Sequence, residues 1–219
     1  MPLVECEATI EQVREGLRRV SPRYLLRHYD VTLEEYDHVI DEDFRCEFLD
    51  GVLIVHSPAS MRHEEMTAFL ITLLSNHAAA RRLGRVYGSN AVMRLGNRRL
   101  CPDVCYLAGG SLVRIRDGVV VGPVDLAVEV ISKSTRSYDL EEKRPAYREA
   151  AVPEIWFFDY ERKQCEADFL EGDRYTSLSL TTGRLASRVL PGLVIDVEWL
   201  WAEPLPNPLD CLRASAPET

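Results

Sequence analysis

The chain has 219 residues, 46% of them hydrophobic and 28% charged, which is an ordinary composition for a globular protein with a sizeable core. No apolar run is long enough to span a bilayer, and the length favours one domain with additions over two full domains. The formal net charge of −9 argues against a bulk electrostatic grip on nucleic acid.

The front of the chain predicts two helices. Residues 8–20 carry apolar side chains at helical spacing, and Ser21-Pro22 ends that pattern. A second helix is expected after Thr32, because Glu35 follows three residues later and completes a capping box.

A hairpin and a long helix come next. The segment RCEFLDGVLIVHS has two strand-like runs that meet at Asp50-Gly51, a favourable hairpin turn. Residues 60–83 form the longest helical pattern of the chain. Leu70, Leu73 and Leu74 lie on its apolar face, and Gly84 ends it.

The second half of the chain alternates strand patterns with one helix, over about residues 138–150. The segment LPGLVIDVEWLW predicts a last strand or turn that ends in a cluster of large apolar side chains with two tryptophans. Strands are predicted near residues 85–95, 103–107, 125–132, 154–159, 165–170 and 174–180. This order predicts an α/β fold with a mixed central β-sheet flanked by helices.

The start of the chain and its cysteines indicate a cytoplasmic protein. The segment MPLVECEATIEQVREG has acids where a signal peptide needs basic and then apolar residues. We therefore expect no membrane anchor, and we expect free thiols at all six cysteines, namely Cys6, Cys46, Cys101, Cys105, Cys165 and Cys211.

Charge is distributed unevenly along the chain. The stretch from Arg81 to Arg116 holds eight arginines and a single acid, Asp103, whereas the stretch from Val31 to Asp50 holds eight acids and one arginine. The chain therefore has an acidic front and a basic middle, which the net charge conceals.

Glu129 stands inside the apolar run Leu126–Ile131, where an ionised carboxylate is costly unless a partner compensates it. Asp103 directly follows Pro102 at the start of another predicted strand. If the two strands are neighbours, both carboxylates meet on one face of the sheet. Either each acid has its own basic partner, or the strand of Glu129 lies at a sheet edge with one face in water, or a hard divalent cation lies between the two acids.

Four further residues are candidates for chemistry. Glu47, on the first hairpin strand, is either a cross-strand charge partner or a site acid. His63, near the start of the long helix, is either a capping or a site residue. Lys143 and Tyr147 share a helix face, where Lys143 forms either a surface ion pair or a cation aimed at the strand ends.

A set of segments resembles the Uma-type family of "putative restriction endonucleases", which belongs to the PD-(D/E)xK nuclease superfamily. The matching segments are CEFLDGVLIVHSPASMRHEE, PDV at 102–104, VDLAVEVISKSTRSYDLEEKRPAY and AVPEIWFFD. They cover about residues 30–180 in the family's order.

The resemblance implies a restriction-endonuclease-like fold and a divalent-metal site for Mg²⁺ or Mn²⁺. It makes Asp103 and Glu129 the metal carboxylates, Glu47 the helper acid and His63 the helix histidine. We accordingly divide the chain into an N-terminal helical extension (1–25), a nuclease-like domain (26–200) and a Pro-rich, frayed tail (201–219).

The chain departs from the superfamily at the motif lysine. That lysine is expected two residues after Glu129, where this chain has Ile131. Lys143, on the following helix, is the favoured replacement and Lys133 the alternative. Pro145 stands two residues after Lys143, where a proline is expected to disturb a helix interior. Ala151 replaces the family's usual Gly.

Three hypotheses for function follow. The first is a Mg²⁺- or Mn²⁺-dependent endonuclease that hydrolyses DNA phosphodiester bonds, with Arg94, Arg98 and Arg99 on backbone phosphates. The second is a non-catalytic module on the same fold that binds nucleic acid or protein. The third is a hydrolase for another phosphate ester.

Other sites find little support in the sequence. There is no GxxxxGK[ST] or GxGxxG motif, so we expect no nucleotide cofactor. Cys101 and Cys105 lack a second ligand pair for zinc. A homodimer is expected from the family's habit and from the apolar cluster Trp199-Leu200-Trp201, which forms either core or a subunit contact.

Overall fold

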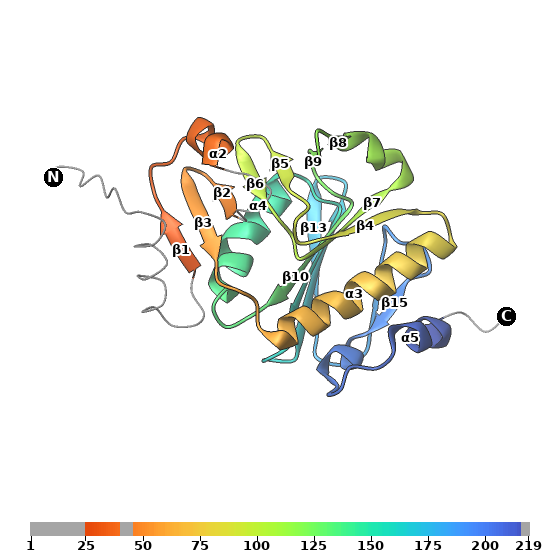
Figure 1. The fold of residues 1–219 in the computed structure, drawn as a ribbon. Coiled ribbons are helices and arrows are strands. Elements are labelled where there is room, and N and C mark those ends of the chain that lie inside the picture. Colours follow the sequence, from red (N-terminus) through yellow and green to blue (C-terminus); the bar gives the residue numbers. More distant parts are fainter. Residues whose placement is uncertain (1–24, 40–45, 216–219) are drawn as a thin grey trace.

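The structure, a computed structural model, describes residues 25–39 and 46–215. The helix predicted over 8–20 and residue Cys6 lie outside these ranges. Two large β-sheets, a two-stranded ribbon and several helices make up the described chain, with α3 (Met61–Ala80) lying diagonally across one side (Figure 1). The predicted mixed α/β class is therefore confirmed.

The larger part of the fold is organised by a six-stranded sheet. Its strands lie in the order β13 (Arg174–Leu180), β12 (Gln164–Glu171), β11 (Glu154–Asp159), β10 (Leu126–Ile131), β7 (Val104–Ala108) and β4 (Gly84–Gly88). β10 pairs parallel with β11 and antiparallel with β7, so the sheet is mixed. β10 lies near the middle of the sheet, and all six of its residues are buried.

A second sheet has seven short strands. They lie in the order β1 (Leu25–His28), β3 (Val52–His56), β2 (Cys46–Leu49), β6 (Arg98–Leu100), β5 (Met93–Leu95), β9 (Val119–Val121) and β8 (Ile115–Arg116). The short helix α2 (Leu33–Val39) lies beside this sheet, and η1 (Gly109–Arg114) precedes β8.

The two faces of the six-stranded sheet bury different layers, because side chains alternate along each strand. Val128 and Val130 belong to one apolar cluster with α3, the two-stranded ribbon of β14 (Arg184–Ala186) and β15 (Val194–Asp196), and the following η3 (Val197–Trp201). Ala127 and Ile131 belong to another cluster, with α4 (Arg144–Glu149) and strands of the second sheet. Glu129 has the parity of this second face.

The local signals at the front of the chain are confirmed. Asp50 and Gly51 both have positive φ, 49° and 87°, which is the type I′ geometry of two-residue hairpins. Thr32 and Glu35 form the predicted capping box, since the Thr32 N–H donates to Glu35 Oε2 at 2.7 Å and the Glu35 N–H donates to Thr32 Oγ1 at 3.2 Å.

The middle of the chain differs from the prediction. The single strand expected over 85–95 is two strands, β4 and β5, in different sheets, because the Ala91 N–H donates to the Gly88 carbonyl and turns the chain. Gly84 begins β4 as well as following α3. A Cβ there would lie 2.0 Å from Leu107 O, so only glycine permits the approach of β4 to β7.

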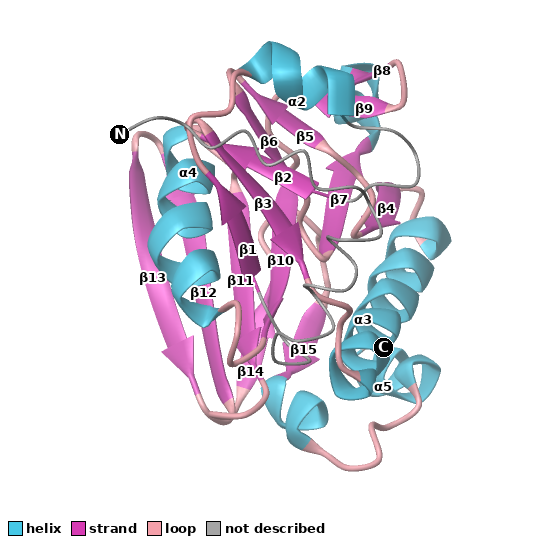
Figure 2. Cartoon of the chain, turned by 60° about the vertical axis from the view of Figure 1, so that its left-hand side comes forward, coloured by secondary structure: helices cyan, strands magenta, loops and turns pink. Residues whose placement is uncertain are grey.

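The helix predicted over 138–150 has two parts. Tyr138–Lys143 is π-helical (η2), and α4 follows it directly. Pro145 falls in the first turn of α4, and the two residues before it, Lys143 and Arg144, keep helical φ and ψ. Pro145 therefore does not disturb the element that carries Lys143. Figure 2 shows α4 and α3 on opposite sides of the molecule.

The C-terminal region is ordered further than the prediction of a frayed tail. Pro208–Ser215 form helix α5, which contacts α3 and buries Cys211. Leu200 is fully buried, and Trp199 and Trp201 pack against the same core, so this cluster is core instead of an exposed contact patch. None of the helices in the described ranges is long and apolar enough to cross a membrane.

Candidate active site

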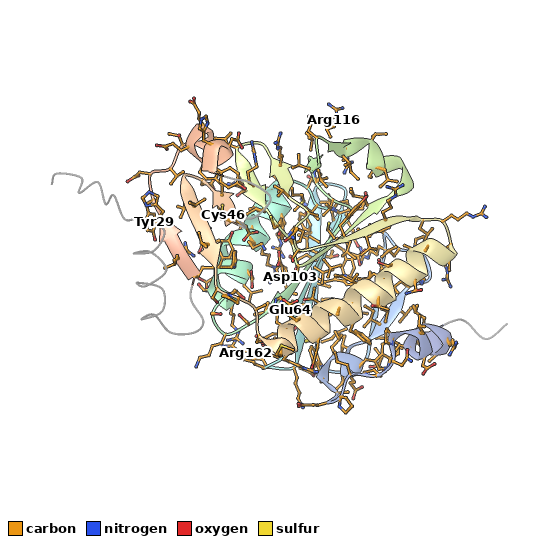
Figure 3. The ribbon with its side chains drawn as sticks, in the orientation of Figure 1. Tyr29, Cys46, Glu64, Asp103, Arg116 and Arg162 are labelled. Atoms are coloured by element: carbon orange, nitrogen blue, oxygen red, sulfur yellow. The ribbon has the colours of Figure 1, made fainter. Side chains whose placement is uncertain are left out.

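A cavity of about 670 Å³ opens where several elements meet. The ends of β3 and β10, the approach to β7, the N-terminus of α3 and the helix η2 all contribute lining residues. Figure 3 places Asp103 and Glu64 beside the N-terminal end of α3, whereas Tyr29 and Arg116 lie at the periphery. The cavity residues used below are His56, His63, Asp103, Glu129, Asp139 and Lys143.

Asp103 and Glu129 stand opposite each other across neighbouring strands. β7 and β10 pair antiparallel with Val104 opposite Val128, so one further step of the same register places Asp103 opposite Glu129. The Val130 N–H donates to Asp103 Oδ2 at 2.9 Å, which fixes this carboxylate against the end of β10. Both carboxylates line the cavity, as the sequence predicted for neighbouring strands.

The surroundings of Glu129 disfavour its charged form. Its side chain is 2% exposed, and its Oε1 accepts hydrogen bonds from Lys143 Nζ and the Tyr147 hydroxyl, both at 2.6 Å. Burial raises the pKa of Glu129 well above its usual range, and Asp103 and Asp139 add to this effect against the opposing charge of Lys143. No donor among the described residues bonds to Oε2, which leaves that oxygen for another ligand.

Glu47 is an anchor beneath the cavity. Its Oε1 accepts from the Cys101 N–H at 2.6 Å and lies 3.2 Å from Lys143 Nζ, and its Oε2 lies 2.7 Å from His56 Nε2. Burial alone would raise the pKa of Glu47, but Lys143 and His56 hold it below its usual range. With both oxygens engaged and 1% exposure, Glu47 orients its partners and is itself withdrawn from the cavity.

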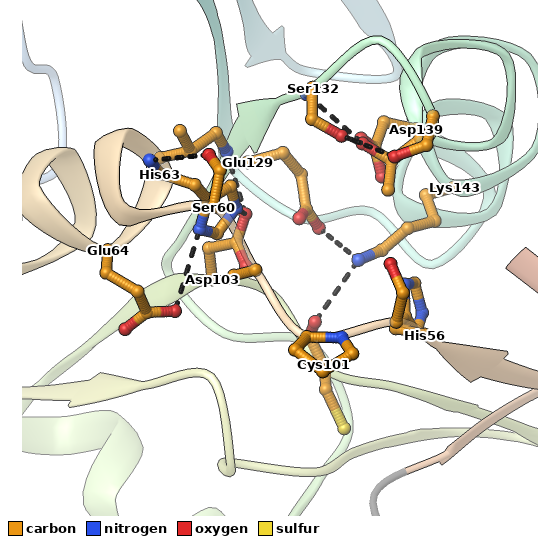
Figure 4. Close-up of a pocket in the computed structure, with 16 residues that line it drawn as sticks. His56, Ser60, His63, Glu64, Cys101, Asp103, Glu129, Ser132, Asp139 and Lys143 are labelled. Carbon is orange, nitrogen blue, oxygen red and sulfur yellow. Dashed lines mark hydrogen bonds and ion pairs between the residues drawn. The ribbon is translucent and has the colours of Figure 1, made fainter. Parts of the chain in front are cut away.

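Lys143 supplies the cation that Ile131 cannot. Ile131 is buried in the second apolar cluster, and Lys133 is exposed beyond the end of β10. Lys143 Nζ instead reaches Glu129, Glu47 and the Cys101 carbonyl, the last at 3.1 Å. Burial alone would lower the pKa of Lys143, but Glu129 and Glu47 outweigh it and raise the pKa. Figure 4 shows this ammonium facing the Glu129 carboxylate.

His63 pairs with Asp103 at the start of α3. Ser60 is the helix N-cap and accepts the His63 N–H at 3.1 Å, which places the imidazole at the cavity edge. His63 Nε2 lies 3.1 Å from Asp103 Oδ2. Burial alone would raise the pKa of Asp103 and lower that of His63. Their mutual hydrogen bond reverses both directions, so the pKa of Asp103 is lowered and that of His63 is raised.

Two cavity residues were missed in the sequence. Asp139 precedes Lys143 by four residues, a spacing typical of a surface ion pair, yet it is 4% exposed, and burial raises its pKa to about 6. His56 was not considered. The hairpin register, which Asp50-Gly51 sets, places Glu47 opposite Ile54 and so His56 on its diagonal, a signal that was readable from the sequence.

The three candidate phosphate contacts do not line the cavity. Arg98 binds Asp50 at 2.7 Å and Glu149 at 2.6 Å. Arg99 is 6% exposed and donates to the Gly96 and Arg98 carbonyls. Arg94 is exposed on β5. Contact of these arginines with DNA stays a prediction, and the ion pairs of Arg98 compete with it.

The donor set fits a hard divalent cation. Asp103 and Glu129 offer carboxylate oxygens into one cavity, and Mg²⁺ commonly takes one or two carboxylates with waters and a substrate phosphate. The described residues contain no ready group of three or more His, Cys, Asp or Glu side chains able to hold a metal ion by themselves. An ion here would therefore depend on water or substrate for most of its ligands.

The same fold occurs in a solved protein. A crystal structure titled as "a putative nuclease belonging to DUF820" from Anabaena variabilis ATCC 29413 is similar to this chain with a TM-score of 0.66. The identity is 12%, and the match covers 78% of this chain and 97% of that one. This likeness confirms the restriction-endonuclease-like fold. Comparison with curated proteins found no match.

The sequence itself matches a family model over residues 33–198, more than half of the chain. That model is Uma2, described as "Putative restriction endonuclease". The matched range includes the hairpin of Glu47, the strands of Asp103 and Glu129, and the helix of Lys143. The chain therefore belongs to the Uma2 family.

Proposed function

We propose that the protein is a divalent-metal-dependent endonuclease that hydrolyses DNA phosphodiester bonds. The observation that carries this proposal is the pairing of Asp103 and Glu129 at adjacent strand ends on one cavity, with Lys143 bonded to Glu129. Family membership and the nuclease neighbour support the nuclease part of the proposal.

Asp103 and Glu129 would hold the ion, Mg²⁺ or Mn²⁺. When bound there, such an ion polarises a phosphoryl oxygen and lowers the pKa of water. The Oε2 atom of Glu129 is the oxygen best placed for this role, because Lys143 and Tyr147 both bind Oε1. The Asp103 carboxylate is already ionised and oriented by the Val130 N–H and His63.

Lys143 would stabilise the negative charge that develops on the phosphoryl group. Its position is fixed from below by Glu47, and its ammonium borders the cavity. Because Lys143 donates to three protein acceptors, it would exchange one of them for a phosphate oxygen when substrate binds.

A non-catalytic binding module on the same fold is the second candidate. The observation in its favour is that Lys143 already donates to three protein acceptors. A lysine that keeps all three stabilises the fold without touching a substrate. Retention of Asp103, Glu129 and the cavity favours the enzyme instead.

Incubation of the protein with supercoiled plasmid DNA and either Mg²⁺ or Mn²⁺ tests the proposal. Nicked or linear product is expected with metal, none with a chelator, and none from Asp103→Asn. Asp173→Asn is the matched control, because Asp173 is 95% exposed. If the wild type cuts no DNA with either metal but binds it, the binding module replaces the enzyme.

We also propose a cytoplasmic homodimer. Trp199, Leu200 and Trp201 pack into the core and do not supply the subunit contact, so the dimer is proposed from the family's habit alone. Sedimentation at tens of micromolar should show a species of twice 24.9 kDa, and a single 24.9 kDa species contradicts the dimer.

A further inference from the structure

His56 ends β3 with its ring directed toward the cavity. It has the strand parity of Ile54, which is fully buried, so the imidazole points to the interior side of the second sheet. Its side chain is 18% exposed and lines the cavity together with Asp139 and Lys143. Figure 4 shows the ring beside the Lys143 ammonium.

Glu47 selects one tautomer of His56. His56 Nε2 lies 2.7 Å from Glu47 Oε2, and Glu47 is ionised because Lys143 sits on its other oxygen. A carboxylate accepts only, so the neutral imidazole must carry its proton on Nε2. Nδ1 then has a free lone pair, and none of the described residues donates to it.

His63 does not offer the same free nitrogen. Its Nε2 bonds to Asp103, and its Nδ1 lies 3.5 Å from Thr67 Oγ1. Of the two imidazoles that line the cavity, His56 is thus the one with an accepting nitrogen left over.

The remaining surroundings of His56 keep its ring in place. Its centroid lies 5.7 Å from that of Tyr138 in a tilted contact, and Leu25 of β1 pairs with His56 along the backbone. The charged residues that line the cavity together with it include Lys143, Asp139, Glu129 and Asp103. The ring is therefore held on one side by a carboxylate and on another by an aromatic ring, as a catalytic base requires.

We propose that His56 is the general base of the hydrolysis, an inference that rests on the proposed function. His56 Nδ1 accepts one proton from the attacking water while the water oxygen forms its bond to phosphorus. The bond from phosphorus to the leaving oxygen breaks, and that oxygen takes a proton from solvent. The imidazolium returns its extra proton to solvent, so no oxidant or further reactant is needed.

His56→Gln tests this role with little change to the fold. The glutamine amide keeps an N–H donor for Glu47 but removes the basic nitrogen. The cleavage rate should fall by about 10²–10⁴-fold, the usual contribution of a general base. Its DNA affinity and melting temperature should stay close to those of the wild type. His38→Gln is the control, because His38 is exposed on α2.

Two further measurements decide the assignment. Added imidazole should restore part of the rate in His56→Ala but not in Asp103→Asn, since a free base replaces only the missing base. Long-range ¹H–¹⁵N spectra of the protein without DNA or metal should show His56 protonated at Nε2 alone.

A His56→Gln enzyme that cuts at the wild-type rate overturns the inference and leaves the nuclease intact. A His56 ring protonated at Nδ1 alone overturns it as well. A wild type that cuts no DNA overturns the nuclease and this inference together.

Discussion

Lys143 Nζ lies 2.6 Å from Glu129 Oε1, and neither side chain is more than 3% exposed. The two residues are fourteen positions apart and come from the edge of a helix and the centre of a sheet. Their contact compensates the carboxylate inside the apolar run of β10. A divalent ion is then a possible second partner of Glu129 and is not its only means of compensation.

Replacement of Lys143 by methionine should destabilise the protein strongly. Removing one partner of a buried ion pair typically costs about 3–5 kcal/mol, because the other charge stays buried without compensation. Urea unfolding at neutral pH measures the change. Lys133→Met, at an exposed position, should stay within about 0.5 kcal/mol of the wild type. Equal losses in both variants would show that the Lys143 contacts contribute little.

A lysine at the motif position should partly replace Lys143. Ile131 follows Glu129 by two residues and lies on the same face of β10, so a lysine at position 131 can reach the Glu129 carboxylate. The double variant Ile131→Lys/Lys143→Met should therefore be more stable than Lys143→Met alone. Ile131→Lys in the wild-type background should be destabilised, because it adds a second buried cation. Additive losses in the double variant would contradict this coupling.

Divalent metal should stabilise the native protein. Binding to the native state alone adds about 2.7 kcal/mol when the ion is present at 100 times its Kd. The melting temperature of the wild type should rise with millimolar Mg²⁺ or Mn²⁺ and should rise less in Asp103→Asn. The exposed Asp173→Asn should behave like the wild type. An identical rise in all three proteins would point to nonspecific ion binding.

The sequence was a good guide where a local signal controls the structure. Asp50-Gly51 specified the hairpin, and the Pro102-Asp103 pair together with the alternation around Glu129 placed both carboxylates on one face. These features depend on turn chemistry and strand parity, which the sequence carries directly. The predicted pairing of the two strands was confirmed by their antiparallel register.

The remainder depended on long-range contacts. The choice of Lys143 over Lys133 was predicted, but its three acceptors come from β2, β10 and the residue before Pro102. The π-helical turn that carries Lys143 has no signature in the sequence. Arg98 and Arg99 were predicted as phosphate contacts because they are basic. The sequence does not show that Arg98 pairs with an acid on another element and that Arg99 donates to a carbonyl of the adjacent turn.

Asp168 should give the protein an acid-sensitive contact outside the cavity. Its carboxylate accepts two hydrogen bonds from Arg144, at 2.7 and 2.8 Å, and others from Arg148 and Ser177. Burial alone would raise the pKa of Asp168, but Arg144 and Arg148 outweigh it and lower the pKa from its ordinary 3.8 to about 2. These bonds hold the first turn of α4, directly after Lys143, against β12.

The sign of the pH dependence follows from that lowered pKa. The charged form is favoured in the folded state, so the contribution of Asp168 is complete above about pH 4 and is lost as the pH falls toward 2. A shift of this size corresponds to about 2 kcal/mol, since one pKa unit is about 1.4 kcal/mol.

Asp168→Asn should therefore be about 2 kcal/mol less stable than the wild type at pH 7. The gap should narrow when urea unfolding is repeated between pH 4 and pH 2. The exposed Asp173→Asn should show no such gap at any pH. A gap between wild type and Asp168→Asn that stays constant down to pH 2 would mean that the Asp168 carboxylate is not the group that titrates.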